Sequence, residues 1–345
     1  MLNKITDSIF YNLFIKTNSP LTKKIIGGKG YIFMLHRILP KVERDKFDFN
    51  KSLAISPEAL QVFIDQFKLL GFEFISIDDV LEYLKKKNSK KFIVFTLDDG
   101  YKDNLTFGLP IFEKNNVPFT VYITNCFPNK NANHWWYHIE SLLKDDNLSF
   151  LNHHLFQELK QNTLDKSVLF DKIRSILLKL SPEDFNNSWS SFFSEKVEKQ
   201  NEMNNNLCLN WDEIIYLSNH KLCTIGAHTL NHVALKHQTN EISFKEMRSS
   251  KTEIENKINK NVDHFCYPYG SLNEVGLREV DFAKKIGYKT AVLNHPASIF
   301  RKHINYPYQI PRIGLSDDIE NERLNKLFNG QLHFNFNGLK KVLLK

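Results

Sequence analysis

The sequence predicts an α/β fold, in which helices alternate with the strands of a parallel sheet. Apolar runs of strand length alternate with segments of helical period through much of the chain. At 345 residues, the chain has the length of one α/β barrel with insertions. Its 42% of hydrophobic and 25% of charged residues are typical of a globular protein, which excludes a disordered or collagen-like chain. A single barrel is favoured over two domains, and a doubly wound open sheet, which has the same local pattern, is the alternative.

In the first third of the chain, strands and helices follow one another closely. A helix is predicted to begin after Ser56, because Pro57 then occupies the first helical position and apolar side chains recur on one face until Gly71. A second, shorter helix is expected over 80–86. Strands are predicted at four apolar runs, 31–35, 72–75, 92–97 and 119–124.

Between about residues 127 and 207 the chain is polar, rich in asparagine and helical in period. We interpret it as a helical insertion that covers one face of the fold. Its aromatic triplet, 135–137, is predicted to pack the insertion onto the domain, and stacking on a sugar ring is the alternative. The predicted organisation is an N-terminal extension (1–30), a barrel domain (31–313) containing this insertion, and a C-terminal extension (314–345).

Regular alternation resumes after the insertion. The sequence Ser243-Phe-Lys-Glu246 has the pattern of a capping box and predicts the start of a helix that runs to about Lys260. Gly287 is expected to end another helix that begins near Asn273. The remaining predicted elements are a helix over 211–218 and strands at 222–227, 264–267, 289–293 and 309–313.

Charge, cysteines and terminal segments limit the partners and the compartment. The formal charge of +7 is spread along the chain, so no nucleic-acid partner is expected. The four cysteines form no C-x-x-C pair, and reduced thiols are expected. The N-terminal apolar run has no cleavage site after it, and no apolar stretch reaches the ~18 residues of a spanning helix, so a cytoplasmic location is expected. The basic and apolar tail 338–345 predicts contact with the inner membrane surface, and packing on the barrel is the alternative.

Polar residues follow three of the predicted strands, at the rim where barrels and open sheets build their sites. Asp98 and Asp99 come directly after 92–97. Two adjacent carboxylates repel each other, so either a cation lies nearby or the two groups have different roles, unless they form a solvated turn. His228 and His232 are spaced so that one helical turn would present both imidazoles to one metal ion, unless they pair by chance. The segment 265–270 predicts a rigid turn with exposed backbone amides that suit an oxyanion.

Together these motifs resemble the polysaccharide deacetylases, the NodB-like family 4 carbohydrate esterases. The family motif T-F-D-D-G is similar to Thr96-Leu-Asp-Asp-Gly100, and H-[ST]-x-x-H is similar to His228-Thr-Leu-Asn-His232. The resemblance extends over about 31–313 and implies a distorted (β/α) barrel. It implies that Asp98 is the catalytic base, and that the metal ligands are Asp99, His228 and His232.

The resemblance also implies the chemistry of the site. The backbone amide of Tyr269 is expected to stabilise the oxyanion. Zinc is the default ion, since two imidazoles and a carboxylate suit it, while iron, cobalt or nickel fit the same ligands. The implied reaction removes an N-acetyl group from an amino sugar of an envelope polysaccharide or of its precursor. A deformylase of a lipid-linked sugar and an inactive carbohydrate-binding barrel are the alternatives.

The sequence departs from the family pattern at two places. Cys266 stands where the family commonly has the arginine that orients the base, as in the F-x-Y-P-Y-G branch of envelope deacetylases, so another residue must orient Asp98. The catalytic acid is His36, in Met34-Leu-His36-Arg37, or His295, in Leu293-Asn-His295. We favour His36, because it follows a buried strand that ends at the same rim.

Overall fold

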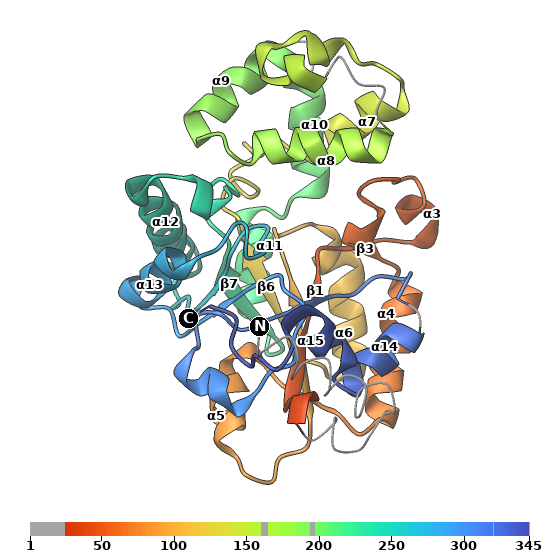
Figure 1. Ribbon diagram of the computed structural model, residues 1–345, viewed down its shortest axis with the longest axis vertical. Coiled ribbons are helices and arrows are strands. Elements are labelled where there is room, and N and C mark those ends of the chain that lie inside the picture. Colours follow the sequence, from red (N-terminus) through yellow and green to blue (C-terminus); the bar gives the residue numbers. More distant parts are fainter. Residues whose placement is uncertain (1–24, 160–164, 194–196, 320, 345) are drawn as a thin grey trace, which may run out of the picture.

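The computed structural model describes residues 25–159, 165–193, 197–319 and 321–344. Its main feature is an eight-stranded parallel sheet that curls into a half-barrel (Figure 1), as the alternation of the sequence predicts. The strand order is β10-β1-β5-β6-β7-β8-β9, and β4 pairs with β5. The strands are β1 (Gly30–Leu35), β4 (Glu73–Phe74), β5 (Phe92–Leu97), β6 (Phe119–Ile123), β7 (Cys223–Ala227), β8 (His264–Cys266), β9 (Thr290–Val292) and β10 (Ile313–Gly314). A small second sheet pairs β2 (Arg37–Ile38) with β3 (Ala54–Ile55).

The two ends of the curled sheet are joined by the segment 310–314. Ile310 exchanges backbone hydrogen bonds with the strand β9 region, accepting from Leu293 and donating to Ala291. Three residues later, Ile313 pairs with Phe33 of β1. The expected strand 309–313 is therefore present as a bridge followed by a short strand, and its residues lie between β9 and β1 rather than at a free edge.

Helices cover the outside of the sheet (Figure 1). The helix α4 begins as expected, because the Ser56 hydroxyl accepts a hydrogen bond from the Ala59 amide at 3.2 Å. The helices of the barrel and of the C-terminal region are α3 (Lys41–Arg44), α4 (Pro57–Leu69), α5 (Val80–Lys85), α6 (Leu109–Asn115), α11 (Trp211–Ser218), α12 (Asn240–Ile258), α13 (Leu277–Ile286), α14 (Asn321–Phe328) and α15 (Gln331–Asn337).

Two predicted helix starts are wrong. The helix α12 begins before Ser243, because the Thr239 side chain caps it, and the buried Ser243 hydroxyl instead donates to the Leu235 carbonyl at 2.7 Å. The helix α13 begins at Leu277 rather than near Asn273. Gly276 is extended at that point and the Glu279 carboxylate accepts from its amide, so the helix can start only after it.

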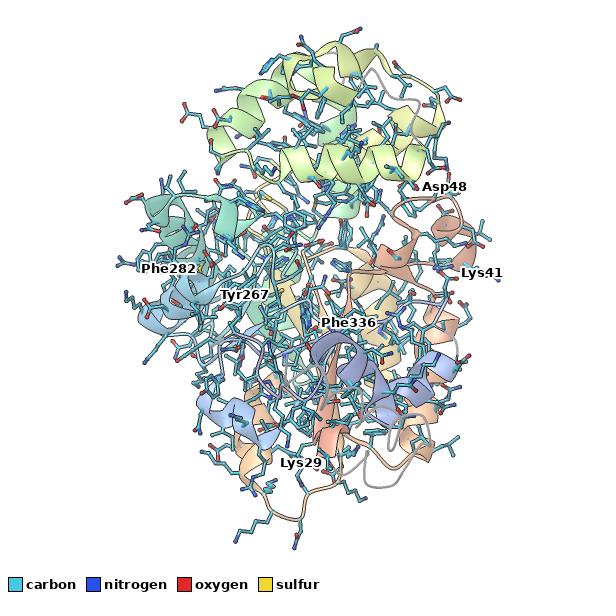
Figure 2. All side chains as sticks on the ribbon, viewed as in Figure 1. Lys29, Lys41, Asp48, Tyr267, Phe282 and Phe336 are labelled. Carbon is cyan, nitrogen blue, oxygen red and sulfur yellow. The ribbon has the colours of Figure 1, made fainter. Side chains whose placement is uncertain are left out.

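The insertion forms a helical lobe beside the barrel (Figure 1), and side chains fill the interior of both (Figure 2). Its helices are α7 (Trp135–Lys144), α8 (Lys166–Leu177), α9 (Pro182–Phe193) and α10 (Val197–Leu207), and no strand occurs in the described part of 127–207. The three side chains of the aromatic triplet 135–137 are buried in an apolar cluster that also contains Tyr101 and Ala234 of the barrel, which agrees with the prediction that they pack the insertion onto the domain. This cluster is separate from the main core of the sheet.

The structure tests the predictions for the two terminal segments only in part. Of the N-terminal extension, residues 1–24 lie outside the described residues, so its boundary stays a prediction. The tail after α15 packs on the barrel: Val342 is buried, Leu343 and Leu344 contact the main core, and the Leu344 amide donates to Gln309 Oε1 at 2.7 Å. Leu339 remains 39% exposed, and a membrane contact stays a prediction. Among the described helices, none is long and apolar enough to span a bilayer.

Candidate active site

A cavity of about 430 Å³ lies where the carboxyl ends of the strands meet the helical insertion. Its size is within the range of small-molecule sites. All six residues that the sequence assigns to the site line it: His36, Asp98, Asp99, His228, His232 and Tyr269. The alternative acid lies elsewhere, because the His295 ring contacts Asn337 Oδ1 of α15 at 2.8 Å through Nε2.

Asp99, His228 and His232 bring three ligand atoms together. Asp99 Oδ1 lies 3.4 Å from His228 Nε2 and 3.2 Å from His232 Nε2. His228 Nδ1 donates to the Cys266 carbonyl at 2.8 Å, so in the neutral ring Nε2 carries the lone pair. Asp99 Oδ1 is buried and has no hydrogen-bond partner of regular geometry. A buried, unsatisfied carboxylate oxygen facing two imidazole nitrogens fits a divalent cation.

The two histidines do not share a helical turn, contrary to the prediction. The segment 228–234 is irregular, and Thr229 (φ 66°) and His232 (φ 55°) adopt left-handed backbone conformations. The same is true of Asp99 (φ 76°) and Tyr269 (φ 60°). Such conformations cost a non-glycine residue about 1 kcal/mol or more. The strain is concentrated at the loops that follow β5, β7 and β8, where it turns the side chains into one cavity.

Arg312 orients Asp98, and the sequence analysis missed it. Its guanidinium donates from Nη1 to Asp98 Oδ1 and from Nη2 to Asp98 Oδ2, both at 2.7 Å. Nε donates to the Leu293 carbonyl at 3.2 Å and Nη1 donates to Thr96 Oγ1 at 3.0 Å, which fixes the planar group. The arginine that contacts the base therefore lies in the segment between β9 and β10. In the family pattern it would stand at the position of Cys266. The available signal was a lone arginine inside the predicted strand 309–313.

Asp98 is ionised despite its burial. Removal from water alone would raise its pKa, but the charge and hydrogen bonds of Arg312 outweigh this effect and lower the pKa below its usual value. A carboxylate offers about four acceptor positions, so the two bonds to Arg312 leave lone pairs free. The ionised group can still accept a proton from a water molecule in the cavity.

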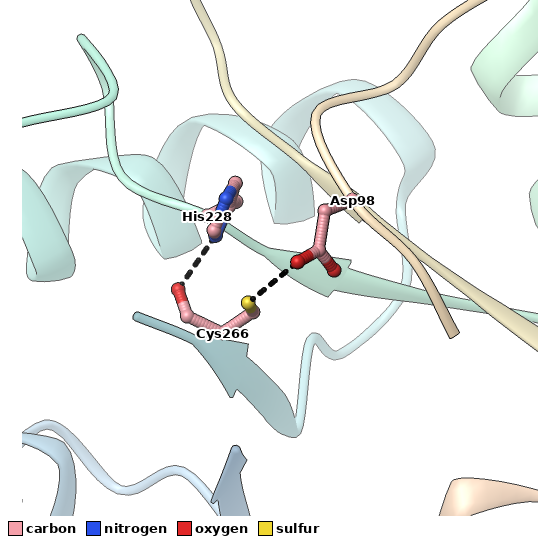
Figure 3. A group of neighbouring side chains, drawn as sticks. All are labelled: Asp98, His228 and Cys266. Atoms are coloured by element: carbon pink, nitrogen blue, oxygen red, sulfur yellow. Dashed lines mark hydrogen bonds between the residues drawn. The ribbon is translucent and has the colours of Figure 1, made fainter. Parts of the chain in front are cut away.

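Asp98, His228 and Cys266 form a second group of possible ligands (Figure 3), which shares His228 with the first. Arg312 makes it unsuitable for a cation, because its guanidinium contacts both Asp98 oxygens and lies 2.9 Å from Cys266 Sγ. Burial raises the pKa of the Cys266 thiol, which therefore stays protonated. The positive charge that a metal ion would supply is already present there, so the group around Asp99 is the better metal site.

The residues after the two aspartates hold His36 in place. Asn104 Nδ2 donates to the His36 carbonyl at 2.8 Å. Asp103 accepts from the Ile38 amide and from Arg37 Nε, each at 2.8 Å, and both Asp103 and Arg37 are buried. Asp103 and Asn104, which continue the aspartate motif, thus fix the chain at His36 and directly after it.

Tyr269 lies against the metal-ligand group. Its hydroxyl accepts from Trp135 Nε1 at 3.3 Å and lies 3.2 Å from His232 Nδ1. Burial raises the pKa of this phenol, so it stays neutral. The Arg174 guanidinium of α8 lies over the ring, 5.3 Å from its centroid. The side chain links the insertion to the site, and the oxyanion role of its backbone amide stays a prediction.

The chain is similar to known proteins in sequence profile and in structure. It matches the family described as polysaccharide deacetylase over residues 85–166 and 189–291. Its fold is similar to that of the deacetylase PplD of Streptococcus pyogenes in complex with acetate (15% identity, 87% of this chain and 97% of that chain, TM-score 0.55). A de-N-acetylase of Aggregatibacter actinomycetemcomitans (13% identity, 86% and 99%, TM-score 0.55) and IcaB of Ammonifex degensii (13%, 88% and 98%, TM-score 0.55) have the same fold.

No curated protein sequence matches the chain. The family match covers both aspartates, both histidines and Tyr269, and leaves out His36 and Arg312. At such low identities, the solved structures establish the fold alone. Since the family profile matches more than half of its residues, the chain belongs to the polysaccharide deacetylase family.

Proposed function

We propose that the protein is a metal-dependent hydrolase that removes an N-acetyl group from an amino sugar of an envelope polysaccharide or of its precursor. The observation that carries the proposal is the convergence of Asp99, His228 and His232 beside an ionised Asp98 in one cavity. Membership of the polysaccharide deacetylase family supports a carbohydrate substrate. The similar chains include a de-N-acetylase and a deacetylase bound to acetate, which supports the N-acetyl group as the target.

Asp99, His228 and His232 would hold the metal ion. A divalent ion in this site lowers the pKa of a water molecule and polarises the amide carbonyl. Zinc is the ion that we propose, and iron, cobalt and nickel accept the same ligands. The Cys266 carbonyl fixes the ring orientation of His228, and Tyr269 contacts the outer nitrogen of His232.

The chain's own residues would then move the protons. Asp98, held by Arg312, accepts a proton from the attacking water as the bond between the water oxygen and the amide carbon forms. The backbone amide of Tyr269 donates to the developing oxyanion. His36 donates a proton to the sugar nitrogen as the carbon–nitrogen bond breaks. The products are acetate and the free amino sugar.

Acetate release from N-acetylated sugars, measured for the zinc-loaded protein and after treatment with a chelator, tests the proposal. We expect release that the chelator abolishes and zinc restores. Formate release from N-formylated sugars without acetate release would favour the deformylase. Bound metal and bound sugar without release of either acid would favour the inactive carbohydrate-binding barrel.

A further inference from the structure

Two arginines at the active-site cavity have no acidic partner among the residues that the structure describes. Arg174 belongs to α8 of the insertion and Arg323 to α14 of the C-terminal region, and both line the cavity that contains Asp98 and Asp99. Neither guanidinium forms an ion pair with a described residue; Arg174 is partly buried and Arg323 is exposed. Two positive charges that line one cavity favour an anionic ligand there, because an anion would reduce the repulsion between them.

The charge balance of the cavity favours an anion. Asp98 is neutralised by Arg312, and Asp99 faces two imidazoles that would share a divalent cation with it. The only other acidic residue among the lining residues is Asp171, which is exposed. The positive charge of the two arginines and of the bound ion therefore exceeds the negative charge of the single free carboxylate.

Arg174 is placed close to the reacting groups. Its guanidinium lies 5.3 Å from the centroid of the Tyr269 ring, and the Tyr269 hydroxyl lies 3.2 Å from His232 Nδ1. One tyrosine side chain thus separates Arg174 from a proposed metal ligand. Stacking on the ring restricts the guanidinium without using any of its five N–H donors. An anionic group bound there would be on the same molecule as the amide that is hydrolysed.

We propose that the substrate is an amino sugar that carries a phosphoester, and that Arg174 and Arg323 bind its phosphate. This inference rests on the proposed function and specifies its substrate class. Guanidinium groups match phosphate oxygens with paired hydrogen bonds, and two of them balance the charge of a phosphomonoester or a diphosphate. A nucleotide-linked sugar and a lipid-linked sugar both have this chemistry. An uncharged polymer offers these arginines hydroxyl acceptors but no negative charge to balance theirs.

The test compares the affinities of N-acetylglucosamine 1-phosphate and N-acetylglucosamine for the zinc-loaded protein by calorimetry. The variants are Arg174→Gln and Arg323→Gln. The matched control is Arg248→Gln, which removes an exposed arginine of α12 that does not line the cavity. We expect the phosphorylated sugar to bind at least about tenfold more tightly than the neutral sugar. Each cavity variant should weaken only the phosphorylated ligand, by about tenfold, and added salt should reduce the preference.

Equal affinity for the two sugars, or equal losses in Arg174→Gln and Arg248→Gln, would overturn the inference. Acetate release separates this failure from that of the proposed function. Release from the neutral sugar without any preference for phosphate would leave the deacetylase standing and overturn the substrate class. Arginine-dependent phosphate binding without release of acetate or formate from any sugar would overturn the hydrolase and its substrate together. The kcat/KM values for a nucleotide diphosphate sugar and a lipid-linked sugar in detergent then identify the source of the phosphoester.

Discussion

The barrel rim and the helical insertion contribute to the cavity in different ways. At the rim, three buried aspartates each have an opposite charge or an imidazole beside them: Asp98 faces Arg312, Asp103 faces Arg37, and Asp99 faces two histidines. The insertion presents buried aromatic rings and the unpaired Arg174. From this comparison we propose that the rim carries the chemistry, while the insertion selects the molecule on which the rim acts.

Apart from substitutions of the metal ligands and of Asp98 itself, the largest combined effect on stability and activity is expected for Arg312→Gln, which leaves the buried Asp98 without its counter-charge. Breaking such a pair costs about 3–5 kcal/mol of stability. Loss of the fixed carboxylate geometry should lower kcat by about 10²-fold. The pKa of Asp98 is lowered by Arg312, so the substitution should raise it and move the acidic limb of the kcat/KM profile to higher pH.

Arg312→Lys serves as the matched variant, because it keeps the charge but cannot form the paired hydrogen bonds. It should retain the fold and show an intermediate kcat. The acidic limb of its pH profile should move to higher pH by less than in Arg312→Gln. An unchanged pH profile in both variants would show that Arg312 only supports the structure.

The second effect concerns the acid. His36→Ala should keep its metal but lower kcat by about 10²-fold or more, because the leaving amine then lacks a proton donor. His295→Ala should remain close to the unsubstituted protein, since its ring contacts Asn337 outside the cavity. Kinetics of the two variants with the same substrate decide between them. The reverse pattern would place the acid in the late motif.

The third effect is on stability and belongs to the insertion. Burial lowers the pKa of His134 to about 3, and its Nδ1 is buried without a partner, so a second ring proton would be unsatisfied. Because the unfolded chain binds this proton at higher pH than the folded one, stability should fall as pH decreases from about 6.5 towards 3. Denaturant unfolding of His134→Gln against pH should show a weaker decline. His237→Gln, at an exposed position, is the control and should leave the decline unchanged.

The smallest effect is expected for Trp135→Phe, which keeps the aromatic ring but removes the hydrogen bond from Nε1 to the Tyr269 hydroxyl. The loss of one such bond amounts to about 1 kcal/mol. If the insertion acts on substrate binding, KM should rise several-fold while kcat stays nearly constant. A fall in kcat with constant KM would mean that the insertion takes part in the chemistry, and the comparison would fail.

The features that could be predicted from the sequence are those that depend on local sequence pattern. The strand 92–97, the start of α4 after Ser56 and the helical nature of the insertion follow from apolar spacing and capping. Ser243 was misread because a second capping residue, Thr239, lies four positions earlier and tertiary contacts bury the serine. His228 and His232 lie together as the spacing predicts, but the predicted helical turn is wrong, because spacing does not reveal the left-handed conformations of Thr229 and His232.

Long-range placement was beyond local patterns. Arg312 is 214 residues from Asp98 in sequence and reaches it only because the segment 310–314 joins the two ends of the sheet. Arg174 and Arg323 come from segments outside or inserted into the barrel, and nothing in their neighbourhood in sequence indicates a common cavity. Such residues can be assigned only once the curvature of the sheet is known.

The division of labour between the two adjacent aspartates is the central claim, and metal content measured together with acetate release tests it most directly. Asp98→Asn should keep one divalent ion per chain and lose activity by about 10² to 10⁴-fold, as expected for a general base. Asp99→Asn should lose the ion itself, since its Oδ1 is the oxygen that faces both histidines. Loss of the ion in Asp98→Asn with retention in Asp99→Asn would contradict the account.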